Sequence, residues 1–296
     1  MKAWAAWVAL TSRREEGTSL ALVRILVGLV VLSDLAGTWA RGAMPLVWGD
    51  VRDTPEGFRK FDEGGLFALL GGARFDTVGG VAAATAVAAL LLAAGVLPRL
   101  CAFAALQGCI ALYGLNHLAG GGHDRLATNA LWLLVLADSG RTLSLGCRWR
   151  TGRWTDPTPV AAWPRQLMVA QLVVMYVGTG LQKTAPEWFP WGGWLAVHHV
   201  LLTPTWARFD LAPVLGLLGP VTRLATAATW AWECTFFAVL LGGPRVRLAY
   251  AALGVAFHGG LWLLTDLGPF SAISLALYPC LARPEAWRRR AERLAA

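Results

Sequence analysis

Eight apolar runs, some of them short, limit what this chain can fold into. A helix needs about 20 mostly apolar residues to cross the hydrocarbon core of a bilayer. Hydrophobic residues make up 56% of the 296 residues and charged residues only 15%, a balance that is rare in soluble domains of this length. The sequence therefore predicts an all-α, polytopic transmembrane helical bundle of about eight spans, forming a single transmembrane domain over 1–296. The predicted spans are 19–37, 78–96, 99–118, 125–138, 165–182, 221–241, 247–265 and 269–282.

Two segments outside these spans have a distinct composition. The stretch 191–218 is apolar but broken by Pro204, Pro213 and Gly216, so we expect it to be re-entrant or interfacial. The loop 41–77 is rich in Asp, Glu and Gly and is the largest predicted extramembrane segment. The chain also holds 16 Trp residues, many near the ends of apolar runs, which is typical of an interfacial aromatic belt.

The distribution of positive charge predicts the orientation. Eight spans put both termini on one side, and the loops of that side, with the basic tail 283–296, hold more than half of the 26 Lys and Arg residues. Because cytoplasmic loops carry the excess of Lys and Arg, both termini are predicted to be cytoplasmic and the loop 41–77 extracytoplasmic. The first span lacks a small-residue cleavage site and is expected to be retained. The net charge of +8 does not indicate nucleic-acid binding, because the basic residues are spread over short loops.

The cysteine and histidine spacing does not indicate a metal site. The five Cys residues form no CxxC pair and lie mostly within apolar runs, where we expect them to be small buried apolar side chains. His198 and His199 are adjacent, so on a helix they point about 100° apart, and no third ligand stands at metal spacing. No metal is expected.

Several ionisable residues fall inside the predicted spans, where each costs a few kcal/mol unless it is paired, hydrated or functional. Arg24 and Asp34 share the first span but are separated by roughly 15 Å along its axis, so each needs a partner elsewhere. Glu233 and His258 lie in the middle of two consecutive spans. They could share a proton or hold a ligand, or they could only lock two helices together through a hydrogen bond.

Two further ionisable residues lie at the outer ends of spans. His123 follows three glycines in GGGHDRL, where the chain can approach other backbone closely, and Asp124 is expected to cap the helix that follows. Lys183 ends a span in YVGTGLQKTAPEW. A lysine at this place usually extends to the headgroups. Here the thin glycine-containing helix before it and the Trp- and Pro-rich segment after it could bury the amine, which favours its neutral, basic form.

Three motifs resemble vitamin K-dependent gamma-glutamyl carboxylase and its bacterial HTTM relatives. The segment GLQKTAPEWFPWGGW is similar to the lysine-containing stretch of that family. The segment GGHDRLATNALWLLVLADSGRTLSL resembles its histidine-led span, and AFHGGLWLLTDLGPFSAISLALYPCLARPEAWRRR resembles its His, Gly-x-Phe-Ser and Pro-Glu-x-Trp signature. The motifs keep their order and spacing over about 19–290.

The resemblance implies roles for four residues. Lys183 falls on the proposed catalytic base of the family, His123 on its active-site histidine, His258 on the histidine that opens the third motif, and Glu233 on an acidic residue common in the preceding span. In the carboxylase the lysine is thought to deprotonate a reduced quinone. Reaction of that quinone with oxygen yields a strong base that removes the γ-proton of a peptide glutamate, after which carbon dioxide adds.

The resemblance also implies a cofactor and a location. We expect a reduced, vitamin K-like quinone with O2 and CO2, and Trp188, Trp191 and Tyr176 are the candidate quinone contacts. The expected location is the bacterial inner (plasma) membrane, with the site open to the extracytoplasmic side. The animal enzymes carry a large lumenal domain after the last span that this sequence does not show, and their lysine pair reads Gln182 and Lys183 here.

The leading hypothesis is a membrane enzyme, carboxylase-like and quinol-dependent, that modifies a peptide or small molecule at the outer membrane face. Whether it carboxylates glutamate stays open at this stage. One alternative is a factor for maturation or export of a peptide toxin, acting with a soluble or membrane partner protein. Another is a non-catalytic subunit of a membrane complex, in which the ionisable residues only hold helices together.

Overall fold

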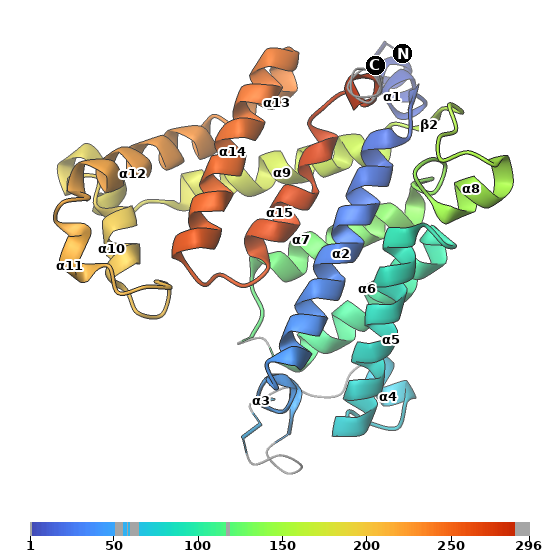
Figure 1. Ribbon diagram of the computed structural model, residues 1–296. Helices are drawn as coiled ribbons and strands as arrows, with labels where there is room; N and C mark the ends of the chain where they lie inside the picture. Colours follow the sequence, from blue (N-terminus) through green and yellow to red (C-terminus); the bar gives the residue numbers. More distant parts are fainter. Residues whose placement is uncertain (1, 51–55, 58, 60–64, 117–118, 288–296) are drawn as a thin grey trace. The chain divides into compact units, whose positions relative to one another are not determined.

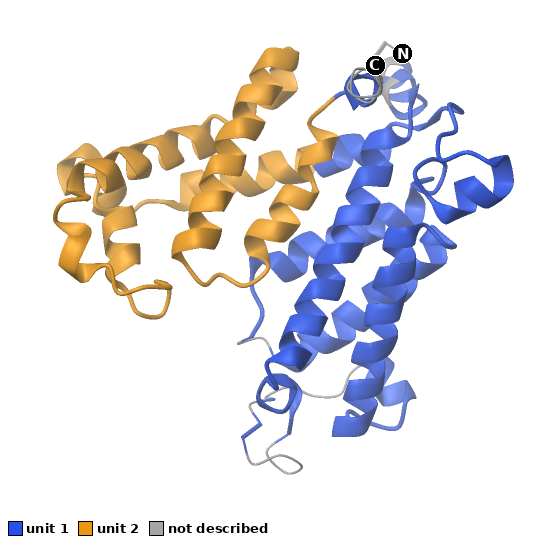
Figure 2. Ribbon diagram, viewed as in Figure 1, with its two compact units in different colours: residues 1–168, 283–296 blue, residues 169–282 orange. Residues whose placement is uncertain are grey.

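The structure, a computed structural model, describes residues 2–50, 56–57, 59, 65–116 and 119–287. These residues are mostly helical, and the only strands among them are β1 (Arg14–Glu15) and β2 (Val160–Ala161), which pair antiparallel. The prediction of an all-α fold is confirmed. The chain divides into two compact units, 1–168 with 283–296 and 169–282 (Figure 2). That the chain acts as a single domain stays a prediction, and the part of the basic tail from 288 on lies outside the described residues.

Unit 1 is built on four helices. Helix α2 (Thr18–Ala40) packs on α5 (Phe75–Ala94), α5 on α6 (Pro98–Leu115), and α6 on α7 (Gly122–Leu136), which returns to α2 (Figure 1). Small residues allow the close contacts: a Cβ at Gly28 would lie 2.7 Å from the Ala89 carbonyl oxygen, and a Cβ at Gly108 would lie 1.8 Å from Thr85 Oγ1. The shorter helices of this unit are α1 (Lys2–Thr11), α3 (Met44–Trp48), α4 (Leu66–Leu69) and α8 (Leu145–Thr151).

Unit 2 begins within α9 (Trp163–Gln182), at Val169. The elements that follow α9 in this unit are η1 (Pro186–Trp188), η2 (Pro190–Gly192), α10 (Ala196–Leu202), α11 (Ala212–Leu215), α12 (Gly219–Cys234), α13 (Ala238–Leu241), α14 (Pro244–Leu264), α15 (Phe270–Ala276) and η3 (Tyr278–Cys280). Helix α12 contacts α10 and α14, and α14 packs against α15 and α13.

All eight predicted spans are helical over most of their length, but the described helices differ in their capacity to cross a bilayer. Four are long and apolar enough: α2, α5, α6 and α14. Helix α7 has 15 residues, α9 has 20 but includes several Gln residues, α12 ends at Cys234, and α15 has 7 residues before η3. The chain is thus a helical membrane protein, and the number of eight spans stays a prediction. The segment 191–218 consists of short helices joined by turns, and its re-entrant or interfacial position stays a prediction.

Arg24 is the central polar residue of unit 1, with none of its surface exposed. Its guanidinium donates from Nη2 to the carbonyl oxygens of Leu143 (2.5 Å) and Ala93 (3.4 Å), and from Nη1 to that of Ser139 (3.2 Å). Ala93 lies in the last turn of α5, where the helix dipole is negative. Gly95, at φ +75°, leaves room for the guanidinium, because a Cβ there would lie 2.4 Å from Nη1. Carbonyl groups, which no sequence pattern could indicate, are thus the partners of this buried cation.

We expect Arg24→Met to destabilise unit 1. Three carbonyl oxygens would lose their donor, and each buried polar group left unpaired costs about 1–3 kcal/mol. The free energy of unfolding in detergent micelles should therefore fall by at least about 3 kcal/mol. The exposed Arg74 provides the control, because Arg74→Met removes the same charge without a buried contact. Equal stability of the two variants would contradict this role of Arg24.

Candidate functional site

Lys183 and Glu233 form a partly buried ion pair in unit 2. Lys183 follows the last residue of α9, and its side chain is 18% exposed, while that of Glu233, near the end of α12, is 5% exposed. The Nζ atom donates to Oε2 of Glu233. Gly180 makes this pairing feasible, because a Cβ there would lie 2.9 Å from the Cys234 backbone nitrogen and 3.0 Å from the Glu233 Cβ. The thin end of α9 predicted from the sequence therefore serves to bring α12 and its carboxylate close.

Aromatic side chains from the segment after Lys183 lie beside this ion pair. The Lys183 Nζ lies 4.8 Å from the centroid of the Trp188 ring, within cation–π range. Phe189 stacks on Trp191, with ring centroids 4.6 Å apart and planes 9° apart, and Trp191 is 76% exposed. Trp194 has a left-handed φ of +59°, which is strained for a bulky side chain. The Pro- and Trp-rich segment thus provides flat apolar surfaces beside the amine.

The hydrogen-bond partners of His258 differ from the Glu233 partner considered from the sequence. It is fully buried, and its Nε2 lies 2.6 Å from the Tyr176 hydroxyl, which in turn lies 2.8 Å from the Tyr278 hydroxyl. The other ring nitrogen, Nδ1, lies 3.4 Å from Ser271 Oγ. The four side chains form a continuous buried hydrogen-bonded chain. The Glu233–His258 pair considered from the sequence is therefore not the arrangement observed, since Glu233 binds Lys183 instead.

Sequence reasoning missed two members of this hydrogen-bonded chain. Ser271 stands in the GPFS motif, so the motif itself could have indicated it. Tyr278 gave no such signal, because its hydroxyl is placed by Gly254 on α14, where a Cβ would lie 1.9 Å from that oxygen. A lone glycine in an apolar helix does not reveal which side chain will approach it.

The hydrogen-bonded chain and the ion pair share one face of α9. Tyr176 and Lys183 are seven residues apart, about two helical turns or roughly 10 Å along the axis. The Tyr176 ring also packs against Trp232, the neighbour of Glu233, with centroids 4.5 Å apart. Because Tyr176 is only 1% exposed and its hydroxyl already has two partners, its predicted role as a quinone contact stays a prediction.

His123 lies in unit 1, in the first turn of α7. Its Nε2 is 2.9 Å from Asp124 Oδ1, and its ring meets Tyr113 edge-on with centroids 6.3 Å apart. Asp124 Oδ2 accepts a hydrogen bond of 3.0 Å from the Gly121 backbone nitrogen, which confirms the predicted capping role. The convergence of His123 with Lys183 and His258 on one chamber stays a prediction, as do the catalytic roles of all four residues.

The histidine pair His198 and His199 and the five cysteines were the remaining residues considered for a metal site. His198 Nδ1 lies 3.4 Å from Thr222 Oγ1, and within the described ranges no three His, Cys, Asp or Glu side chains gather as metal ligands would. Four of the five Cys residues are buried and Cys234 is half-buried, in line with the sequence.

We expect Tyr176→Phe to destabilise unit 2 more than Tyr278→Phe does. The first change removes both hydrogen bonds of the Tyr176 hydroxyl and leaves His258 and Tyr278 each without that partner, whereas the second removes only one bond. At about 1–3 kcal/mol for each buried group left unpaired, the loss should be roughly twice as large for Tyr176→Phe. Unfolding of the two variants in mixed micelles measures the difference. Equal losses would contradict the central place of Tyr176 in this chain of hydrogen bonds.

The fold and these contacts define a class of protein: a helical membrane protein in which a lysine at a helix end is paired with a carboxylate beneath aromatic side chains. The model of the HTTM domain matches residues 12–287, nearly the whole chain, so the chain belongs to the HTTM family. This confirms the family indicated by the three motifs. Comparison with curated proteins and with solved structures gave no match.

Proposed function

We propose that this chain is a membrane enzyme in which Lys183 acts as a base and a reduced quinone is used to modify a peptide or small molecule at the extracytoplasmic face. The observation that carries the proposal is the Lys183–Glu233 ion pair beside Trp188, at the motif that resembles the carboxylase lysine. Carboxylation is the form of modification that the resemblance favours.

The ion pair supports a base because the Glu233 carboxylate, 5% exposed, holds the Lys183 Nζ beside the Trp188 ring. Lys183 is 18% exposed, so its ammonium would release a proton to solvent, and the neutral amine would then take a proton from a bound acid. The ammonium formed in this step would again be paired with the Glu233 carboxylate. The carboxylate would thus position the lysine and stabilise its charged form.

The surroundings of Lys183 fit a quinone ring. The indole of Trp188 and the stacked rings of Phe189 and Trp191 offer flat apolar faces, which a planar ring prefers. A bound quinol would supply, with oxygen, the strong base that the family reaction requires. Trp188 and Trp191 would hold the ring, and Lys183 would take the hydroxyl proton. His258 and His123 would orient the reactants or stabilise charge.

The topology belongs to the same proposal. Eight spans with both termini cytoplasmic would place the site toward the extracytoplasmic side of a bacterial inner membrane, with 191–218 re-entrant or interfacial. Basic residues at one end of unit 1 support this orientation. The turn between α5 and α6 contacts the start of α8, where Gly146 donates to the Gly95 carbonyl oxygen, and Arg148 and Arg150 lie in the last turn of α8.

Quinol-dependent oxygen uptake by the purified chain in lipid nanodiscs tests the proposal. We expect uptake above that of empty nanodiscs when a reduced naphthoquinone is supplied, with or without bicarbonate. Uptake equal to that of empty nanodiscs, with several quinols and with the protein folded, would reject the enzymatic reading and favour a binding or subunit role.

A further inference from the structure

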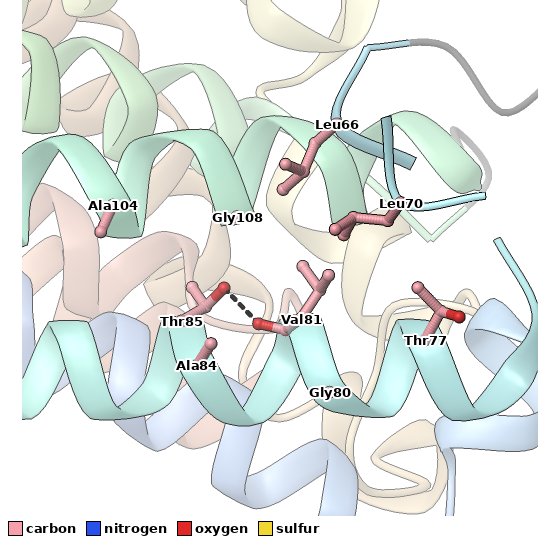
Figure 3. A pocket seen from close by; sticks show the side chains of 9 residues that line it. All are labelled: Leu66, Leu70, Thr77, Gly80, Val81, Ala84, Thr85, Ala104 and Gly108. Carbon is pink, nitrogen blue, oxygen red and sulfur yellow. Dashed lines mark hydrogen bonds between the residues drawn. The ribbon is translucent and has the colours of Figure 1, made fainter. Parts of the chain in front are cut away.

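An apolar groove lies in unit 1, and none of the candidate site residues lines it. Its volume is about 410 Å³. Figure 3 shows that its walls come from α5 and α6, while Leu66 and Leu70, from α4 and the residue after it, cover one end. The wall residues are Thr77, Gly80, Val81, Ala84 and Thr85 on α5 and Ala104 and Gly108 on α6.

The lining cannot hold water well. It includes no charged residue, and its only polar side chains are two threonines. The Thr85 hydroxyl already donates a 2.6 Å hydrogen bond to the Val81 carbonyl oxygen (Figure 3). A buried water needs two to four polar partners. The groove is therefore a hydrocarbon site, and both walls are helices long and apolar enough to cross a bilayer, so the surrounding solvent is lipid.

The groove is too small to enclose a helix. A helix with its side chains is about 10–12 Å wide, so a volume of 410 Å³ corresponds to less than one turn of it. A methylene group occupies about as much volume as a water molecule, roughly 30 Å³, so the same volume holds on the order of a dozen methylenes. A slender chain between glycine and alanine walls is the shape that fits.

We propose that this groove binds one acyl chain of a membrane phospholipid. The small side chains at Gly80, Ala84 and Ala104 give the slot its depth, and the leucines close it at one end. Bound in this way, the lipid becomes part of the packing between α4, α5 and α6. The proposal is independent of the enzymatic function.

Substitution of two neighbouring glycines gives a matched test. Added Cβ atoms at Gly79 and Gly80 would meet nothing within 4 Å, so a side chain can begin at either position without a backbone clash, but only Gly80 lines the groove. Gly108 is unsuitable, because a Cβ there would lie 1.8 Å from Thr85 Oγ1 and would separate the helices. The probe is a phosphatidylcholine with a diazirine in one acyl chain, photoactivated in nanodiscs and mapped by peptide mass spectrometry.

We expect labelling concentrated on peptides from α5 and α6, at least fivefold above that of α14, whose surface is also exposed to lipid. Gly80→Leu should lower the α5 and α6 labelling at least fivefold, whereas Gly79→Leu should leave it unchanged. Four results would overturn the proposal. Three come from the labelling: labelling of α5 and α6 no higher than that of α14, equal labelling of the two leucine variants, or labelling abolished by an isoprenoid quinone but not by unlabelled phospholipid. The fourth is the formation of dimers joined at α5 by a separate bifunctional crosslinker, which would assign the groove to a second copy.

Discussion

Lys183→Ala is expected to lower quinol-dependent oxygen uptake by on the order of 10²–10⁴, the contribution that a positioned base usually makes. This change removes the proposed base, while Trp188, Trp191 and the rest of the aromatic segment, the proposed quinol contacts, remain. Uptake measured in nanodiscs at saturating quinol gives the rate, and quinol titration separates a loss of rate from a loss of binding.

Two variants control this experiment. Lys183→Arg keeps a cation beside Glu233 but cannot supply a neutral amine, because the guanidinium stays protonated, so it should fold normally and remain inactive. Gln182→Ala changes the exposed neighbouring residue and should keep the wild-type rate. An active Lys183→Arg variant would show that the positive charge, and not the base, is what the site uses.

Glu233→Leu is expected to lower the free energy of unfolding by about 3 kcal/mol, since breaking a buried ion pair from one side leaves an uncompensated charge. Lys183 is 18% exposed and can partly reach solvent, so we expect the lower end of the usual range. Unfolding in mixed micelles, followed by the fluorescence of the tryptophans, measures the change.

The double variant Lys183→Met with Glu233→Leu separates structure from chemistry. Replacing both charges with apolar groups should recover most of the lost stability, since buried pairs replaced together are often neutral or stabilising. Oxygen uptake should stay absent in this stable protein. A double variant as unstable as Glu233→Leu alone would mean that the pair does not account for the stability loss.

The helices were largely predictable because bilayer length and hydropathy act on each segment alone. The predicted span 19–37 corresponds to Thr18–Ala40, and 247–265 to Pro244–Leu264. The span 221–241 was predicted as one helix, but α12 ends at Cys234 and the chain turns before α13. Its apolar composition continues through that turn, and apolar composition alone does not show where a helix breaks.

The sequence indicated which ionisable residues belong to the candidate site, but not which of them contact one another. Lys183, Glu233 and His258 stand out because an ionisable group in a span is costly. Their partners depend on which face each helix presents, and that is set by packing between residues far apart in sequence. Gly180 lets α12 approach α9 closely, so that Glu233 contacts Lys183. Gly254 leaves room for the Tyr278 hydroxyl, which then joins the hydrogen-bonded chain of His258. The catalytic roles and the place of His123 relative to the ion pair remain predictions.

Acylation of lysines by a small apolar reagent tests the central claim most directly. The chain has only three lysines, Lys2, Lys60 and Lys183, so peptide mass spectrometry can follow each one and the first two serve as internal references. If Lys183 is a reactive amine at a quinone site, it should be acylated near neutral pH, and a reduced naphthoquinone should slow its acylation at least fivefold without changing that of the references. Acylation of Lys183 that is unaffected by saturating quinol, or that never occurs while the references react, would contradict the account.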